Sequence, residues 1–255
     1  MRAAGRRLAD SVPVTALELI VIGAAVFVAS FMQVISGFGF ALLSVPLMTL
    51  AVPAKEAVVV SMIVGLAATT RQSWELREYA DRGLVRPMVI GAYLGMPIGL
   101  WVFVTVADDV LRLMLGVAVL VAVVLLAFRI NLHHVGRSLD VGAGFISGIL
   151  NTSLSTNGPP LVFALQARQL PPDRFRATLA WVFTLSAVVG LVMFIAAGKV
   201  THAGLVGAAV AFPSMLLGQM VGFPMRKHVD GERFRYLVLL LLTVAAVTAI
   251  VTALT

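Results

Sequence analysis

The chain has 255 residues, of which 60% are hydrophobic and 12% charged, and its mean hydropathy is +1.01. Ordinary soluble domains have about 45 to 50% apolar and about 25% charged residues, so this composition indicates an integral membrane protein. The chain contains no Cys, which excludes disulfides, thiolate metal sites and cysteine nucleophiles. The net charge of +7 does not predict a nucleic-acid partner, because the basic residues lie in short loops where they hold helices against the cytoplasmic leaflet.

Apolar stretches separated by charged segments follow one another along the whole chain. Many approach the roughly 20 residues that a helix needs to cross a bilayer. Their Leu, Val and Ala runs lack the alternating pattern of a transmembrane barrel, so we predict an all-α membrane protein. The stretches cover about 14–52, 56–75, 84–106, 110–129, 139–167, 175–198, 203–225 and 236–255.

The first stretch, 14–52, is too long for one crossing, and the segment ISGFGF at 35–40 interrupts it. The fifth stretch, 139–167, is interrupted by NTSLSTNGPP at 151–160. Glycine is conformationally loose and proline lacks an amide donor, so such clusters break helices. Each stretch is therefore predicted to be two short helices joined by a non-helical break at membrane depth. The residues assigned to the breaks themselves include Ser36, Pro46, Pro159 and Pro160.

The stretches form two sets of four, which predicts a duplication. LGMPIG at 94–99 aligns with LGQMVG at 217–222, and Pro46-Leu47 aligns with Pro160-Leu161. The most polar segment near the middle of the chain lies between the two sets. We therefore divide the chain into a first repeat at 1–130, a linker at 131–138 and a second repeat at 139–255.

The loop charges indicate how the broken stretches fold. If every stretch crossed once, the basic loops near 168–176 and 226–235 would fall on the non-cytoplasmic side, against the positive-inside rule. If both broken stretches fold back as hairpins, these loops become cytoplasmic and only the Arg-rich amino terminus violates the rule. Each set then contributes a hairpin and three crossings, so we predict two inverted repeats, a common plan among transporters.

The interruption at 151–160 has the chemistry of an anion site. Non-helical backbone at membrane depth survives only when it is buried in protein or lines a cavity. Pro159 and Pro160 suit the first turn of a helix that is predicted to run to about Gln166. The start of such a helix offers free amides and the positive end of a dipole. The candidate substrate-binding residues of this half are Asn151, Thr152, Ser153, Ser155, Thr156, Asn157 and Gly158.

The first half offers a plainer version of the same site. Gly37 and Gly39 allow close backbone approach, and Ser44 lies on the short helix that follows. No acidic or basic residue lies deep inside an apolar stretch, so the predicted pocket has donors and no formal charge. The glycines at 91–99 and at 218 and 222 have four-residue spacing, which is typical of close helix packing.

These motifs resemble the TauE/SafE sulfite exporter family, also called the toluene sulfonate uptake permeases. GFGFALLSVPLM at 37–48 is similar to the family's first glycine-rich motif, and GFISGILNTSLSTNGPPLVFAL at 144–165 is similar to the second. The likeness continues in RFRATLA at 174–180 and GERFRYLVLLLL at 231–242. The family's motif positions fall on Gly37, Gly39, Pro46, Ser147, Gly148, Gly158, Pro159 and Pro160, which adds Ser147 and Gly148 to the structural residues of the break. Many members have more glycine where this chain has Ser155, Thr156 and Asn157.

The resemblance implies a multi-pass carrier of the bacterial inner membrane that moves sulfite, sulfonates or other small organic anions. We expect a secondary transporter that works by alternating access, and the alternative is an anion-permeable channel using the same donors. An enzyme is disfavoured because the spans hold no metal-ligand cluster and no paired carboxylates, and we expect no cofactor. The expected partners are the anion, the lipid bilayer and a coupling ion, either a proton or sodium; the oligomeric state is left open.

Overall fold

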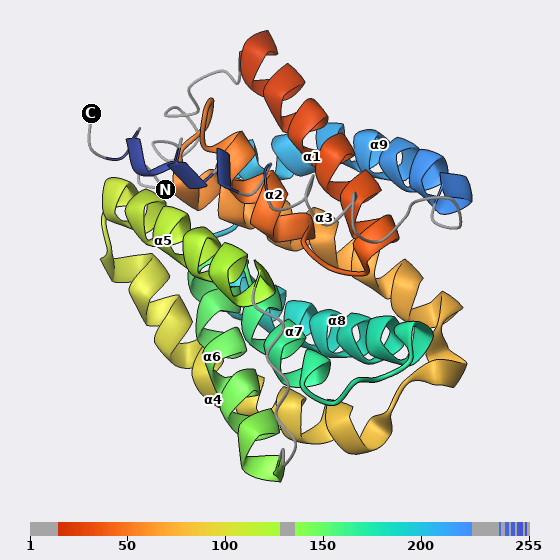
Figure 1. Cartoon of the computed structure of the whole chain (residues 1–255). Helices are drawn as coiled ribbons and strands as arrows, with labels where there is room; N and C mark the ends of the chain where they lie inside the picture. Colours follow the sequence, from red (N-terminus) through yellow and green to blue (C-terminus); the bar gives the residue numbers. More distant parts are fainter. Residues whose placement is uncertain are drawn as a thin grey trace.

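The computed structural model describes residues 15–127, 136–225 and part of 240–253. In these residues all regular structure is helical, which confirms the predicted all-α class (Figure 1). The Arg-rich amino terminus, most of the linker at 131–138 and the segment 226–239 lie outside the described residues. The elements are α1 (Ala16–Ser36), α2 (Phe40–Met48), α3 (Ala54–Glu75), η1 (Arg77–Tyr79), α4 (Arg82–Thr105), α5 (Asp108–Ala127), α6 (Arg137–Leu154), α7 (Gly158–Gln166), α8 (Pro172–Ala196) and α9 (His202–Met225).

Four of the described helices are long and apolar enough to cross a membrane, namely α1, α4, α8 and α9. Large apolar side chains such as Leu94, Trp101 and Met220 are more than 60% exposed on the outside of the bundle. A soluble protein would bury most of this surface, whereas a membrane protein presents it to lipid. The bundle is therefore that of a multi-pass membrane protein.

Both broken stretches are interrupted where predicted, but only their second helices are short. α1 has 21 residues and α6 has 18, whereas α2 and α7 have nine each. The prediction of two short helices in each stretch was therefore wrong for the first member. The reason is that the helix-ending residues are Gly37 and Ser155, both in the left-handed region, at φ 88° and 58°. Before those positions neither helix contains a proline or a residue with a positive φ.

The short helix α2 runs back between α1 and α3. Phe40, at the start of α2, lies against Gly65, and Ser44 hydrogen-bonds to Ser61, earlier in α3. α2 is therefore antiparallel to α3. Pro46 lies inside α2, whereas Pro160 lies in the first turn of α7, so aligning these two prolines puts the short helices four residues out of register.

Three long helices run in the same direction on one side of the molecule. Gly204 and Gly207 of α9 lie against Val59 and Val60 near the start of α3, and Arg71 bonds to Gln219 near the ends of both helices. α9 also runs parallel to α1, because Gly218 and Gly222 pack against successively later residues of α1. α1 and α3 are thus parallel, and the chain returns between them through α2.

The glycines at 91–99 form a close helix contact, as their spacing predicted. A Cβ atom added at Gly91, Gly95 or Gly99 of α4 would lie 2.1 Å from a backbone carbonyl oxygen of α6. The same is true in reverse for Gly144 and Gly148 of α6, at 2.1 and 2.0 Å from carbonyl oxygens of α4. Only glycine allows two helix backbones to approach this closely. α4 and α6, which come from different halves of the chain, consequently pack in parallel.

Basic residues gather at the end of the bundle where α3 ends and where α4, α6 and α8 begin. We call this the basic end; its described Arg residues are Arg71, Arg77, Arg82, Arg86, Arg137, Arg168, Arg174 and Arg176. Several of them tie elements together there. Arg176 donates to the carbonyl of Ile35 at 3.1 Å, and Arg168 pairs with the buried Asp140 at 2.7 Å. At the opposite end Asp108 accepts from the amides of Ala54 and Lys55, at the start of α3.

Candidate functional site

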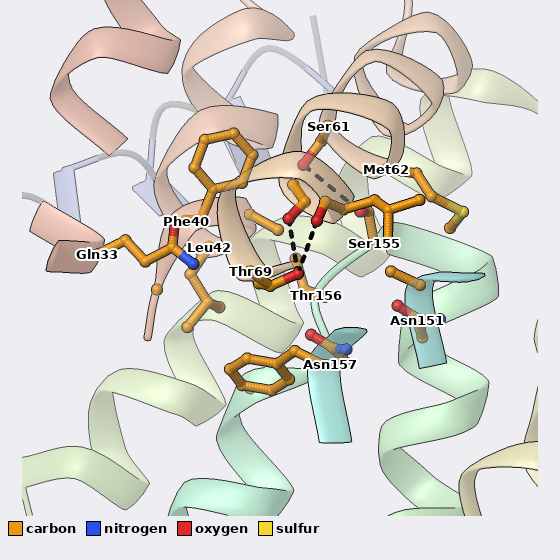
Figure 2. A pocket seen from close by; sticks show the side chains of 17 residues that line it. Gln33, Phe40, Leu42, Ser61, Met62, Thr69, Asn151, Ser155, Thr156 and Asn157 are labelled. Carbon is orange, nitrogen blue, oxygen red and sulfur yellow. Dashed lines mark hydrogen bonds between the residues drawn. The ribbon is translucent and has the colours of Figure 1, made fainter. Parts of the chain in front are cut away.

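A cavity of about 50 Å³ lies where the two helix breaks meet (Figure 2). Its walls come from the tips of both hairpins, from the middle of α3 and from α8. The lining residues are Gln33, Gly39, Phe40, Ala41, Leu42, Ser61, Met62, Gly65, Leu66, Thr69, Asn151, Ser155, Thr156, Asn157, Gly158, Phe183 and Ala187. None of these residues carries a charge, in agreement with the prediction of an uncharged pocket. We call this space the central cavity.

The first hairpin brings the start of α2 to the central cavity. Gly37 and Gly39 have φ angles of 88° and 92°, which other residues adopt only with strain, so this turn requires glycine at both positions. Gly39 is followed directly by Phe40, and no side chain caps the helix start. The first amides of α2 therefore lack intrahelical partners and lie at the positive end of the helix dipole, beside the cavity.

The second hairpin brings the start of α7 to the opposite wall. Ser155 ends α6 in the left-handed conformation, and the Ser147 hydroxyl donates to the carbonyl of Asn157 at 2.9 Å, which fixes the turn. α7 begins at Gly158, one residue from the predicted start, and ends at the predicted Gln166. Because Pro159 and Pro160 have no N–H, this helix start offers fewer backbone donors than that of α2. Side chains of the turn add polar groups in their place.

Hydroxyl and amide groups form hydrogen bonds around the central cavity, and one of these bonds joins the two halves of the chain. Ser155 donates to Ser61 at 3.4 Å, and Ser61 also bonds to Ser44 at 3.2 Å. On the far side of the same turn, the amide nitrogen of Asn151 donates to the carbonyl of Ser186 at 3.3 Å. These bonds hold the tip of the second hairpin against α3 and α8.

Two polar groups beside the cavity have no hydrogen-bond partner although they are buried. They are the side-chain amide oxygen of Gln33 and the hydroxyl of Thr156, on residues that are 2% and 1% exposed. In Figure 2 the amide of Gln33 lies on the opposite side of the cavity from Asn151. Unsatisfied buried polar groups are rare in folded proteins, and a bound ligand or water is an ordinary explanation for them.

The structure brings six of the predicted substrate-binding residues to the central cavity and places four elsewhere. Gly39, Asn151, Ser155, Thr156, Asn157 and Gly158 line it. Of the others, Gly37 packs against the Arg176 side chain and Ser44 reaches the cavity only through its bond to Ser61. The hydroxyl of Thr152 donates to Met96 of α4 at 2.6 Å, and that of Ser153 donates back to Ile149 at 2.7 Å.

The break residues likewise divide between the turns and the helices. Ser36 stabilises the first turn by donating to the carbonyls of Met32 and Phe38. Pro159 and Pro160 open α7 as predicted. Ser147 and Gly148 lie inside α6. Ser147 still stabilises the turn, because its hydroxyl donates to the carbonyl of Asn157, ten residues later in the sequence.

Several lining residues were not singled out from the sequence, chiefly Gln33, Ser61 and Thr69. Gln33 and Ser61 each lie between apolar neighbours, and Thr69 opens the polar run TTRQS at 69–73. For a helical Ser or Thr a back-bond to the helix is the usual role, and Thr69 indeed donates to the carbonyl of Gly65 at 2.9 Å. A signal for Gln33 did exist. It lies four residues before Gly37, as Asn151 lies four residues before Ser155, and both carbonyls accept from the residue that ends the helix.

The sequence of the chain matches a known protein family. The family model described as "Sulfite exporter TauE/SafE" matches residues 5–249. The chain belongs to the TauE/SafE family. A relative from Cupriavidus necator, described as a probable sulfite/organosulfonate exporter TauE, is 26% identical over 203 residues, which cover 76% of this chain and 78% of the relative. No solved structure matches the chain.

Membership of the TauE/SafE family identifies the protein as a membrane transporter. Together with its apolar helices, it places the chain as a multi-pass protein in the bacterial inner membrane. The family is one of transporters, not of enzymes. Within the described residues no group of three His, Cys, Asp or Glu residues could hold a metal ion.

Proposed function

We propose that this TauE/SafE protein is a secondary transporter that binds a small anion in the central cavity and moves it by alternating access. The substrate is sulfite, a sulfonate or another small organic anion. The observation that carries the proposal is the meeting of two helix starts, those of α2 and α7, at one uncharged cavity lined with hydroxyl and amide groups. Helix starts favour anions through their dipoles and free amides.

The size of the cavity agrees with a small substrate. A single water requires about 10 to 15 Å³ of such space, so a cavity of about 50 Å³ has room for a few atoms of water size, as in a compact oxyanion. The buried hydroxyl of Thr156 has no partner here, and an oxyanion could accept its hydrogen bond. A substrate with a long apolar tail would need the cavity to widen between Phe40 and Phe183.

We further propose that the two halves are inverted repeats. Two features of the first half recur 118 residues later. The helix end at Gly37 corresponds to that at Ser155, and the helix cap at Pro53 corresponds to that at Pro171. The packing is also reciprocal, because α4 pairs with α6 and α1 pairs with α9, both in parallel. α3 and α8 run antiparallel, since Ser73 contacts Thr184 while Met62 contacts Gly190. Corresponding helices therefore have opposite directions, which supports the inverted plan and a site at the repeat interface.

The distribution of charge supports an orientation with the basic end in the cytoplasm. Positively charged loops favour the cytoplasmic side of bacterial membrane proteins. At the basic end the described residues include eight Arg, whereas Lys55, Arg112 and Lys199 lie toward the opposite end. Alternating access would then open the central cavity first to one end of the bundle and then to the other.

The test uses purified protein reconstituted in liposomes. We expect saturable flux of radiolabelled sulfite or of a small sulfonate, with counterflow when unlabelled anion is present on the other side. Flux without saturation or counterflow would indicate a channel instead. Absence of flux with every sulfur oxyanion, sulfonate and carboxylate tried would contradict the proposal.

Binding variants then test the site. In a thermal-shift assay the transported anion should stabilise the wild type, and Asn157→Ala and Ser155→Ala should weaken this stabilisation. Thr70→Ala is the matched control, because its hydroxyl is exposed on α3 and bonds back to Leu66, outside the cavity. Stabilisation that persists in both cavity variants would show that the anion binds elsewhere. Repeating the flux assay with a sodium gradient or with a proton gradient would identify the coupling ion.

A further inference from the structure

A second, smaller cavity lies between the ends of α1, α3 and α9 at the basic end. It has a volume of about 20 Å³ and is lined by nine residues, Gln33, Val34, Ala68, Arg71, Gln72, Glu75, Leu76, Gln219 and Phe223. Unlike the central cavity, it contains charged groups. Arg71 is the cation among its lining residues and Glu75 is the anion.

Arg71 is held at the mouth of this cavity by three partners. Its Nε donates to the Glu75 carboxylate at 2.9 Å, its Nη1 donates to Gln219 at 3.4 Å, and its guanidinium lies 4.9 Å from the centre of the Phe223 ring. The side chains of Arg71 and Glu75 are 42% and 38% exposed, so their ion pair is open to solvent and weak. Such a pair can exchange its carboxylate for another anion at small cost.

Gln33 lies between the two cavities, because it lines both of them. It is 2% exposed, and its side-chain amide oxygen has no hydrogen-bond partner. The neighbouring α3 residues alternate between the two spaces, with Thr69 facing the central cavity and Ala68 and Gln72 facing the smaller one. The Gln33 side chain is therefore a thin polar partition between the central cavity and Arg71.

We propose that this second cavity is an anion subsite on the route between the central cavity and the basic end, with Arg71 as its binding group and Gln33 as the partition. The proposal rests on the proposed transport of a small anion. An anion that leaves or enters the central cavity at this end takes the place of the Glu75 carboxylate on Arg71. The carboxylate must move aside to make room, because about 20 Å³ holds only one or two waters. A guanidinium presents several donors in a fixed plane, which suits sulfite, sulfonate and carboxylate groups.

The subsite compensates for what the central cavity lacks. An uncharged cavity binds an anion through dipoles alone and does not attract it over a distance. A positive group at the mouth raises the local concentration of anions and so favours entry from that end. Glu75 holds Arg71 in place while no anion is bound.

The experiment measures the half-saturating anion concentration for flux separately from each side of oriented proteoliposomes. The probe is the anion that the wild type transports. Arg71→Gln should raise this concentration about tenfold at the basic end, as expected for the loss of one hydrogen bond to a charged group, and should leave it unchanged at the other end. Arg71→Lys should restore only part of the affinity, because it keeps the charge and loses the planar set of donors. Glu75→Gln should lower the half-saturating concentration at the basic end. Arg77→Gln is the control, because Arg77 lies at the same end and outside both cavities.

The outcomes separate this inference from the proposed function. If the wild type transports no anion, the proposed function fails first. Suppose that the wild type does transport an anion, but that Arg71→Gln changes the half-saturating concentration at neither end or equally at both. This result would overturn the proposed subsite and would leave the proposed site in the central cavity unaffected. Thermal stabilisation by the anion, which reports the central cavity, should survive in Arg71→Gln. Gln33→Ala shortens the side chain that separates the two cavities and does not change the charge at the basic end. This variant should therefore transport the anion through the basic end faster than the wild type, and slower flux would contradict the role of Gln33 as the partition.

Discussion

The hydroxyl of Ser155 donates to that of Ser61 at 3.4 Å, which joins the tip of the second hairpin to the middle of α3 in the other half of the chain. Ser155 also has a φ of 58°, a conformation that costs a residue with a side chain about 1 to 2 kcal/mol relative to glycine. A serine is thus present where backbone geometry alone favours glycine.

Substitutions at Ser155 should separate these two effects. Ser155→Ala loses the hydroxyl and keeps the strain, whereas Ser155→Gly loses the hydroxyl and relieves it. We expect Ser155→Gly to be more stable than Ser155→Ala by about 1 kcal/mol in thermal unfolding. Both should bind the anion more weakly than the wild type. Equal stability of the two variants would mean that the turn adapts without strain.

The contact between α4 and α6 should tolerate no side chain at its centre. Gly95→Ala places a methyl carbon 2.1 Å from the carbonyl oxygen of Phe145, so the helices must separate. We expect a loss of several kcal/mol of stability, seen as poor yield and an early transition in detergent. Gly142→Ala is the control on α6, because nothing lies within 4 Å of its added Cβ. That variant should be neutral or slightly more stable, since alanine favours helix.

The ion pair of Arg168 with Asp140 should matter more for folding than the exposed pairs. The Asp140 side chain is 3% exposed; its Oδ2 accepts from Arg168, and its Oδ1 has no hydrogen-bond partner. Arg168→Leu leaves a buried carboxylate without its cation and should cost about 3 kcal/mol. Adding Asp140→Asn to that variant should recover part of the loss, which thermal unfolding of the two would measure. No recovery would show that Arg168 acts through packing alone.

The orientation can be mapped directly, because the chain has no cysteine of its own. Asp173→Cys, at the exposed start of α8, should react with an impermeant thiol reagent only from the cytoplasmic side. Ala197→Cys, at the other end of α8, should react only from outside. Labelling of the Asp173→Cys variant from outside would contradict both the orientation and its basis in the positive-inside rule.

Local chemistry explains which parts of the site could be predicted. The start of α7 followed from Gly158, Pro159 and Pro160, because proline restricts its own backbone and removes a donor whatever surrounds it. The break after α1 followed from two glycines in the same way. The prediction of short helices before the breaks failed because neither helix contains a proline or a residue with a positive φ that would end it earlier.

Helix phase explains which side chains could not be assigned. Thr152, Ser153 and Asn151 are neighbours in sequence, yet α6 continues to Leu154 and turns successive residues to different sides. Thr152 consequently meets α4, Ser153 bonds back to its own helix and only Asn151 reaches the cavity. A cluster that looked uniform in sequence is thus divided by about 100° of rotation for each residue.

By itself the sequence determined the membrane environment, the helical class and the two places where the chain stops being helical. These follow from hydropathy and from the backbone limits of glycine and proline, which act over a few residues. Only the tertiary structure decided that Gln33, Ser61 and Asn151 line one cavity and that Arg71 lies beyond Gln33. These residues lie on α1, α3 and α6 and are brought together by packing between helices that are far apart in sequence. Such packing depends on contacts between distant residues that no local pattern specifies.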